Sequence, residues 1–575
     1  MTPKPNPALV TQDAARRLPR LALLVFCAAY LLPGLFGRDP WRGADLNAFG
    51  QMLAIAEGRA SWLQPSLGGV PTDAALLPHW IGAAAILAGR GWVDPALAAR
   101  VPFALLLALA LVAVWYASFH LARSEAAQPL PLAFGGEASP VDYARAVADG
   151  ALLAVIATLG LLQLGHETTP ELAQLAAVAC LQWAMAAAAH RGWQARAGVL
   201  LALPALAACG APSIAMVLGA GAALLCLRAG DAGTKSLAPW LVAAMGVAAL
   251  VAWPVHSWAW RVASEIDDGV ALARLLLWFL WPAWVLALWT LWRWRRHLMQ
   301  RHLAIPLLGL GVALAACLAM GGSDRALMLG VPGIAVLAAF ALPTLHRGRT
   351  AVIDWFSVFF FTVCATSFWI FYSAMQTGGP AWALRTVQRL APGFKSQFSW
   401  TPLLLAALAS IAWLWLVRWR TSHQREVIWK SLVLPAGGVA LCWLLLMTLW
   451  LPLLDYVRSN RPLAERLVRQ VPAGACIAAP GAPPSLVAAL EFHGRRRVDA
   501  TPGAARGRCP VLMMELQQRG PEVARSAAAA AAASRGWREV GRERRLTDRS
   551  AVVVVYRRAD ADPAAPRVTP PAPSR

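Results

Sequence analysis

Apolar runs long enough to cross a bilayer recur along most of this chain, and few proteins other than multi-pass membrane proteins contain so many. Of its 575 residues, 58% are hydrophobic and only 14% are charged, which exceeds what a soluble core takes up. The sequence therefore predicts a polytopic α-helical membrane protein with about thirteen transmembrane helices. We place the spans at residues 20–36, 100–122, 146–164, 170–189, 195–208, 212–228, 238–254, 270–292, 304–320, 325–343, 352–374, 400–418 and 432–453.

Basic residues gather in the loops that fall on one side when these runs alternate across a membrane. Residues 293–302 and 418–430 are examples, whereas loops on the other side carry more acids, Gly and Trp. This asymmetry predicts a cytoplasmic N-terminus and an odd number of spans. It also accounts for the formal net charge of +22, so we expect no nucleic-acid partner.

Two segments leave the span assignment open. Residues 195–208 and 212–228 are short and separated by Cys-Gly-Ala-Pro, so a re-entrant hairpin is an alternative to two crossings. Residues 78–91 are apolar but too short to cross comfortably, and a crossing there would turn every later basic loop outward. We expect this piece to lie along the membrane surface as a juxtamembrane helix within a first external loop at residues 37–99.

At about residue 456 the apolar runs give way to a polar, basic sequence, so we assign residues 1–455 to the transmembrane module. Residues 456–558 read as a small α/β domain on the periplasmic side, and residues 559–575 as a disordered Pro/Ala-rich tail. Expected elements are strands at 475–479, 510–514 and 551–556, the last one central, and helices at 485–491 and 527–533. Cys476 and Cys509 are the only cysteines of this domain, and a disulfide and two buried thiols are both open readings.

Six residues on the external side are candidates for a functional site. Each has an ordinary structural explanation: Asp45 as the N-cap of a helix over 45–57, Asp73 as a turn acid, and Glu167 as a helix-capping acid. His166 beside Glu167 is a weak metal signal, since zinc needs three or four ligands. Arg59 and Arg261 fit either anchoring at the interface or binding of a phosphate.

Four short stretches carry a family resemblance. Residues 44–49 read A-D-L-N-A-F, 58–65 read G-R-A-S-W-L-Q-P, 67–75 read L-G-G-V-P-T-D-A-A, and 99–102 read A-R-V-P. Their order and spacing resemble the D-E-x-x-Y, G-D-W, N-G-x-P-Y-F-E-K-P-P and A-R-x-P segments of GT-C membrane glycosyltransferases that use a polyprenyl-phosphate-linked sugar. The chain most resembles the branch of aminoarabinose transferases and protein O-mannosyltransferases.

The resemblance implies roles for the candidate residues. It gives Asp45 the place of the family's catalytic acid, and Asp73 the place of the Glu in F-E-K-P-P. Glu167, with His166 before it, takes the place of the acid after the third span, where it would support the acceptor or contact a metal. The family's lysines are absent, since E-K-P-P reads D-A-A-L here and L-T-K-G-P reads A-C-G-A-P at 208–212. The donor phosphate would then be bound by Arg59 or Arg261, or by a divalent cation.

The resemblance therefore implies a glycosyltransferase of the bacterial inner membrane. It would move a hexosyl or pentosyl group from an undecaprenyl-phosphate carrier to a lipid, glycan or protein acceptor on the periplasmic side. Residues 43–80, 165–169 and 256–269 would line one cavity. The alternative is a non-catalytic relative that binds lipid-linked glycan or scaffolds envelope assembly, which the missing lysines favour and the retained acids disfavour.

Overall fold

The computed structural model describes residues 8–558, apart from 73–74, 132–134, 254–257, 259–268, 346, 423–426, 519–522, 524–525, 527–529, 532–535, 546 and 548–550. The chain divides into two compact units that do not follow sequence order. The first unit comprises Met1–Asp39, Asp73–Leu384 and Ser396–Pro452. The second unit joins Pro40–Thr72 and Arg385–Lys395 to Leu453–Arg575, so part of the first external loop folds with the tail.

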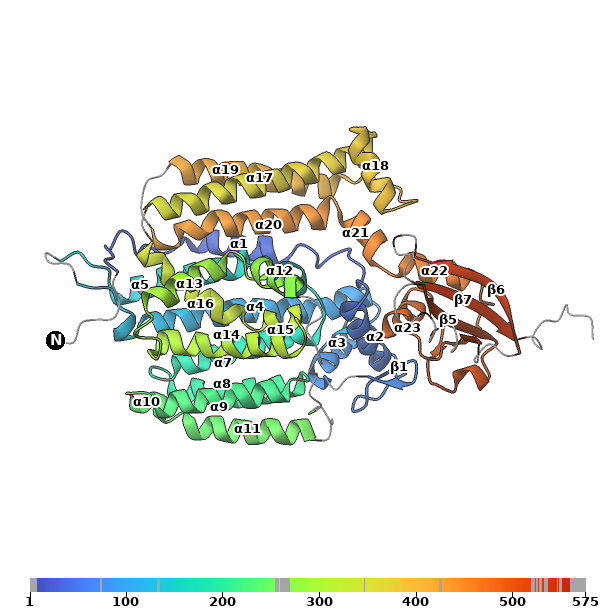
Figure 1. The fold of residues 1–575 in the computed structure, drawn as a ribbon, viewed down its shortest axis with the longest axis horizontal. Coiled ribbons are helices and arrows are strands. Elements are labelled where there is room, and N and C mark those ends of the chain that lie inside the picture. The colour runs from blue at the N-terminus through green and yellow to red at the C-terminus, as the bar shows by residue number, and fades with distance from the viewer. Residues whose placement is uncertain are drawn as a thin grey trace, which may run out of the picture. The chain divides into compact units, whose positions relative to one another are not determined.

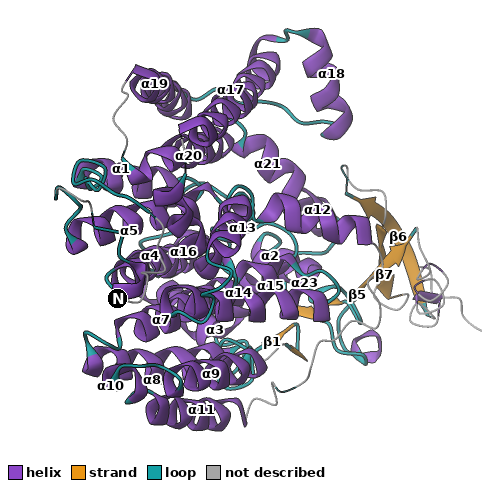
Figure 2. Ribbon diagram, turned by 60° about the vertical axis from the view of Figure 1, so that its left-hand side comes forward, coloured by secondary structure: helices purple, strands orange, loops and turns teal. Residues whose placement is uncertain are grey.

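The first unit is a bundle of helices, most of which run side by side in both ribbon views (Figures 1 and 2). Its helices are α1 (Arg20–Leu31), α3 (Leu76–Ala88), α4 (Pro95–Ala122), η1 (Glu125–Ala127), α5 (Pro140–Ala157), α6 (Leu161–Leu164), α7 (Pro170–Ala187), α8 (Gly192–Ala208), α9 (Pro212–Leu227), α10 (Ala232–Lys235), α11 (Ala238–Ala252), α12 (Gly269–Phe279), α13 (Ala283–Arg293), α14 (Arg301–Ala319), α15 (Asp324–Met328), α16 (Val331–Ala341), η3 (Leu342–Thr344), α17 (Arg347–Thr377), α19 (Trp400–Ser422), η4 (Ile428–Leu432) and α20 (Val433–Thr448). Two further helices, α18 (Ala381–Leu390) and α21 (Leu451–Arg458), have residues in both units.

Burial separates the inner helices of this bundle from the outer ones. All 11 residues of α16 are buried, so this helix is apolar on every side. By contrast, α17 and α19 expose large apolar side chains such as Trp355, Phe359 and Leu408. Since no soluble protein would leave such faces in water, they are suited to contact lipid.

Helices cover all thirteen ranges predicted as spans, but the number of spans is not confirmed. Among the described residues, six helices are long and apolar enough to cross a membrane, or seven if one bent pair counts as a span. The span predicted over 270–292 is sharply bent, because α12 and α13 there meet at 86°. Pro282, which directly precedes α13, explains the break, because proline cannot donate the helical hydrogen bond.

The tail of the chain forms a five-stranded sheet in the second unit. The strands are β3 (Ile477–Ala478), β4 (Val498–Asp499), β5 (Val511–Gln517), β6 (Trp537–Arg544) and β7 (Ala551–Arg558), in the order β4-β3-β5-β7-β6. β4, β3 and β5 are parallel, whereas β5, β7 and β6 are antiparallel. The other elements are α2 (Ala44–Ala56), β1 (Ser66–Leu67), β2 (Val70–Pro71), α22 (Arg461–Arg469), α23 (Pro484–Phe492) and η5 (Ala504–Arg506).

The predicted α/β character of the tail is confirmed. The three expected strands are β3, β5 and β7, and the expected helix is α23. β7 lies between β5 and β6, so it is an interior strand, as its run of four valines predicted. The helix expected at 527–533 lies mostly outside the described residues, and the tail at 559–575 lies entirely outside them.

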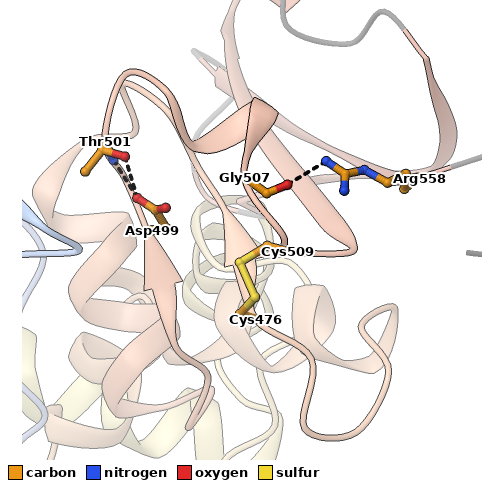
Figure 3. Close-up of a disulfide and its surroundings, with 6 residues drawn as sticks. All are labelled: Cys476, Asp499, Thr501, Gly507, Cys509 and Arg558. Carbon is orange, nitrogen blue, oxygen red and sulfur yellow. Dashed lines mark hydrogen bonds between the residues drawn. A yellow bond between two sulfur atoms is a disulfide. The ribbon is translucent and has the colours of Figure 1, made fainter.

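Cys476 and Cys509 form a disulfide, which selects one of the two readings left open by the sequence (Figure 3). The bond joins the residue before β3 to a residue two positions before β5, in the parallel half of the sheet. Near it, the Arg558 guanidinium donates to the carbonyl of Gly507 at 2.6 Å, which ties the end of β7 to the same loop.

Replacing both cysteines with serine should therefore lower the thermal stability of the full chain. The cross-link closes a segment with a sequence separation of 33, for which the chain-entropy account gives about 4 kcal/mol. Thermal unfolding in detergent, with and without a reductant, measures the effect. Reductant should shift the wild type toward the double variant, while the free thiol variant Cys180→Ser should melt like the wild type. A double variant as stable as the wild type would contradict a structural disulfide.

Candidate functional site

Asp45 lies in the first turn of α2, the buried helix of the second unit. The helix has 13 residues, 11 of them buried, and its N-cap is Gly43. The expectation that Asp45 is the N-cap is therefore wrong by two positions. Its carboxylate Oδ2 instead accepts a hydrogen bond from the backbone N–H of Trp41 at 3.1 Å, which turns the entering chain back over the helix. A carboxylate at this end is also stabilised by the helix dipole.

The chain before α2 is fixed by residues at the end of α21. The Trp41 indole N–H donates to Asp455 at 2.8 Å, and the Arg458 guanidinium lies 5.0 Å from the centre of the Trp41 ring. The backbone N–H of Arg42 also donates to the carbonyl of Arg458 at 2.9 Å. Asp45 has an exposed fraction of only 2%, so the residues packed around it hold its carboxylate in one position.

Close packing joins α2 to the tail domain. A Cβ at Gly50 would lie 2.6 Å from the Cβ of Ala488 on α23, so the two helices approach at a glycine. Phe49 and Phe492 meet edge to face, with ring centres 4.8 Å apart. The carbonyl of Gly68, in the β1–β2 turn, accepts from the N–H of Ala500 at 2.8 Å. The segment that carries Asp45 is therefore part of the tail domain's core.

Arg59 links the same segment to α23 through a buried ion pair. Its guanidinium contacts Glu491, whose side chain is 5% exposed, and donates from Nε to Glu57 at 2.7 Å. Burial raises the pKa of Glu491 above its ordinary value, and the Arg59 charge opposes that rise. A donor phosphate would have to compete with two carboxylates for this guanidinium, so its assignment to phosphate binding stays a prediction.

Arg59→Gln should destabilise the protein by about 1–3 kcal/mol, because it leaves a buried carboxylate without its cation. Without Arg59, the folded-state pKa of Glu491 rises further above the unfolded-state value. As pH rises above about 4.3, Glu491 loses its proton in the unfolded state before it does so in the folded state. The loss of stability caused by the substitution should therefore grow with pH. Thermal unfolding at pH 5 and pH 8 measures this, with Arg542→Gln, an exposed arginine of β6, as control. A deficit that is the same at both pH values would contradict it.

Glu167 is a buried acid of the first unit, in the turn before α7. Its side chain is 4% exposed, and it accepts from Arg325 at 2.6 Å and from Gln163 at 2.8 Å. Arg325, on α15, also lies 3.5 Å from Glu171 on α7. Nothing in the sequence indicated the pairing of Glu167 with Arg325. The result is a charged pair held by short hydrogen bonds at the end of the bundle.

His166 is held by the backbone around it. Its ring nitrogens Nδ1 and Nε2 lie 2.8 Å from the carbonyl oxygens of Leu162 and Tyr30, respectively. Its own carbonyl accepts from the Arg38 guanidinium at 2.7 Å. A neutral imidazole carries one N–H, so His166 donates to one of these two carbonyl oxygens, and both of its ring nitrogens face the backbone. In this arrangement it fixes the turn that carries Glu167 rather than presenting a nitrogen to a metal.

A small hollow, part of it open to the surface, lies beside this turn within the first unit. Arg100 and His166 are its charged and polar residues, and the rest of its lining is apolar or glycine. Arg100 is the Arg of the A-R-V-P stretch that the sequence singled out, here placed near the start of α4. The hollow thus brings that motif next to the turn with the candidate acid.

The candidate residues fall into two groups. Asp45 and Arg59 lie in the second unit, and His166 and Glu167 are adjacent in the first. Asp73 and Arg261 lie outside the described residues, so a common cavity stays a prediction. Across the described part of the chain, no three His, Cys, Asp or Glu side chains gather as a metal site. Glu167 and Glu171 are arranged around an arginine, and the expected divalent cation stays a prediction.

Comparisons with known proteins support the fold. No protein family and no curated protein match the sequence. The structure is similar to that of ArnT from Cupriavidus metallidurans bound to undecaprenyl phosphate, with a TM-score of 0.62 and 13% identity, covering 93% of this chain and 97% of that one. The apo structure of the same ArnT gives 0.59 and 13%, over 93% and 96%. The likeness shows an ArnT-like fold, as the predicted architecture requires, and does not choose a branch.

Proposed function

We propose that this chain is an inner-membrane glycosyltransferase that takes a sugar from an undecaprenyl-phosphate carrier and passes it to an acceptor on the periplasmic side. The observation that carries the proposal is the likeness to ArnT across 93% of the chain, combined with a buried carboxylate, Asp45, in the segment that resembles the family's first motif. One of the two ArnT structures is bound to undecaprenyl phosphate, which supports a polyprenyl-phosphate donor. The apolar helices support a multi-pass location.

The proposed reaction needs a base and a stabilised leaving group. The acceptor oxygen or nitrogen attacks the anomeric carbon, the bond from that carbon to the phosphate oxygen breaks, and undecaprenyl phosphate leaves with the electron pair. Asp45 takes the proton that the acceptor loses. Positive charge at the phosphate stabilises the developing anion, and we assign this to Arg59 or Arg261, with Asp73 as a supporting acid. Glu167, held by Arg325, orients the acceptor.

Transfer in membranes tests the proposal. Membranes containing the wild-type chain, supplied with a labelled polyprenyl-phosphate sugar, should label an acceptor that control membranes do not label. Glu167→Gln should reduce labelling strongly, whereas Glu171→Gln should leave most of it, because Glu171 shares Arg325 at a longer distance but has no proposed role. Equal labelling with and without the chain would reject the transferase. Equal loss in both variants would reject the role of Glu167.

A non-catalytic relative remains the second candidate, and one observation favours it. The lysines of the family motifs are absent, and Arg59 already contacts two carboxylates. Such a protein would bind the labelled donor without consuming it. Retention of the intact donor by the purified chain, with no labelled acceptor, would establish this function in place of transfer.

A further inference from the structure

Basic side chains from three segments meet at one end of the bundle in the first unit. They come from the end of α4, the turn between α7 and α8 and the start of α14, and α10 marks this end in Figure 1. The rings of His120 and His190 lie 5.9 Å apart. Arg123, Arg191 and Arg301 all act electrostatically on His120. We call these five residues the basic cluster.

The basic cluster has too little negative charge to balance it. Among the described residues, Asp231 is the acid that contacts the basic cluster, with its carboxylate 3.4 Å from the guanidinium of Arg301. Burial, together with Arg123 and Arg301, lowers the pKa of His190, and only Asp231 opposes the shift. The three arginines of the basic cluster carry like charge and repel one another, so a bound anion would stabilise the arrangement.

Two nitrogens in the basic cluster have no hydrogen-bond partner within the described protein. His120 is 4% exposed, and its Nδ1 is buried and unpaired. Nε of Arg301 is also buried and unpaired, although the same guanidinium donates to the carbonyl of Met185 at 3.0 Å. Because a buried polar group without a partner costs free energy, the Nε–H of Arg301 points to a ligand that accepts hydrogen bonds, and Nδ1 of His120 can donate to the same ligand in one of its two tautomers.

The surroundings place this site at the level of lipid headgroups. His120 is in the last turn of α4, which is long and apolar enough to span a membrane. Trp193, two residues after Arg191, is 73% exposed, and tryptophan favours the membrane–water interface. Arg196, one turn further along α8, lies 5.7 Å from the centre of the Trp240 ring. Basic pockets between transmembrane helices at this depth suit phosphate headgroups.

We propose that the basic cluster is a binding site for an anionic phospholipid. The guanidinium groups of Arg123, Arg191 and Arg301 bind its phosphate, and the buried His120 lies on the inner side of these groups. Arginine suits this role because its planar fork donates two hydrogen bonds to phosphate oxygens at once. A lipid with two phosphates, such as cardiolipin, would balance more of the positive charge than one with a single phosphate. Within the first unit, the basic cluster lies at the opposite end of α7 from the turn that carries Glu167.

Ligand-dependent thermal unfolding of the purified full chain tests this site. In detergent, added cardiolipin should raise the melting temperature by several degrees and phosphatidylglycerol by less, since binding to the folded state stabilises it. Phosphatidylcholine should have no effect. The double variant Arg123→Gln/Arg191→Gln should lose the rise. The matched control Arg295→Gln/Arg296→Gln removes the same charge from exposed arginines in the loop before α14, and it should keep the rise.

The other outcomes overturn the proposal. Equal loss in both double variants would mean that the basic loops attract lipid only through their overall charge. A rise with inorganic phosphate as large as that with cardiolipin would mean an anion site without lipid. If the first double variant does not fold, the exposed single variant Arg191→Gln replaces it and should lose part of the rise. A full rise in that variant would count against the site.

Discussion

Asp45→Asn should lower sugar transfer by about 10²- to 10⁴-fold while the protein stays folded, if the proposed transferase is correct. Asparagine has nearly the same shape, and its amide oxygen can still accept from the N–H of Trp41. It cannot take up the proton that the acceptor loses. The expected result is therefore a loss of turnover at unchanged donor binding, measured with the labelled polyprenyl-phosphate sugar.

Asp499→Asn is the matched control for this prediction. Asp499 is also an acid of the second unit whose carboxylate accepts from backbone, in this case from the N–H of Thr501 at 3.0 Å (Figure 3). Its replacement should cost a little stability and leave turnover intact. Full turnover in Asp45→Asn, or the same loss in both variants, would remove Asp45 from the proposed reaction.

Helices and the main tail strands could be predicted because their signals are local. A long apolar run specifies a buried or lipid-facing helix wherever it lies in the chain. The valines of β7 specify an interior strand in the same way. β4 and β6 were missed, because β4 has two residues and β6 alternates charged residues on an exposed edge strand. Pro282 also indicates a bend, but the apolar run continues on both sides of it and was therefore predicted as one span.

The partners of the candidate residues could not be predicted in this way. Arg59 pairs with Glu491 across 432 positions, and Arg325 pairs with Glu167 across 158. Any of several arginines fits such an acid equally well from sequence alone. The family resemblance singled out Asp45 and Glu167 because their motifs are short and local, and the roles of both residues stay predictions. It gave no reason to expect that residues 40–72 would fold with the tail, which depends on long-range packing.

Gly50→Val is the substitution that tests this packing most sharply. Its Cβ would lie 2.6 Å from that of Ala488, so α2 and α23 would have to move apart. Overpacking of this kind costs about 1–3 kcal/mol, and the shift would also move Asp45, five residues earlier on α2. Because a displacement of about 1 Å can cost about 10²-fold in rate, we expect lower stability together with a large loss of transfer.

Gly246→Val separates the effect of packing from that of valine itself. Gly246 is a helical glycine of α11 whose Cβ would meet nothing within 4 Å, so both variants share the change in helix propensity. Melting temperature and transfer should stay near wild-type values in Gly246→Val and fall together in Gly50→Val. If the two variants behave alike, the contact between α2 and α23 does not position Asp45. If Gly50→Val loses stability but keeps transfer, the tail domain stabilises the first external loop without shaping the site.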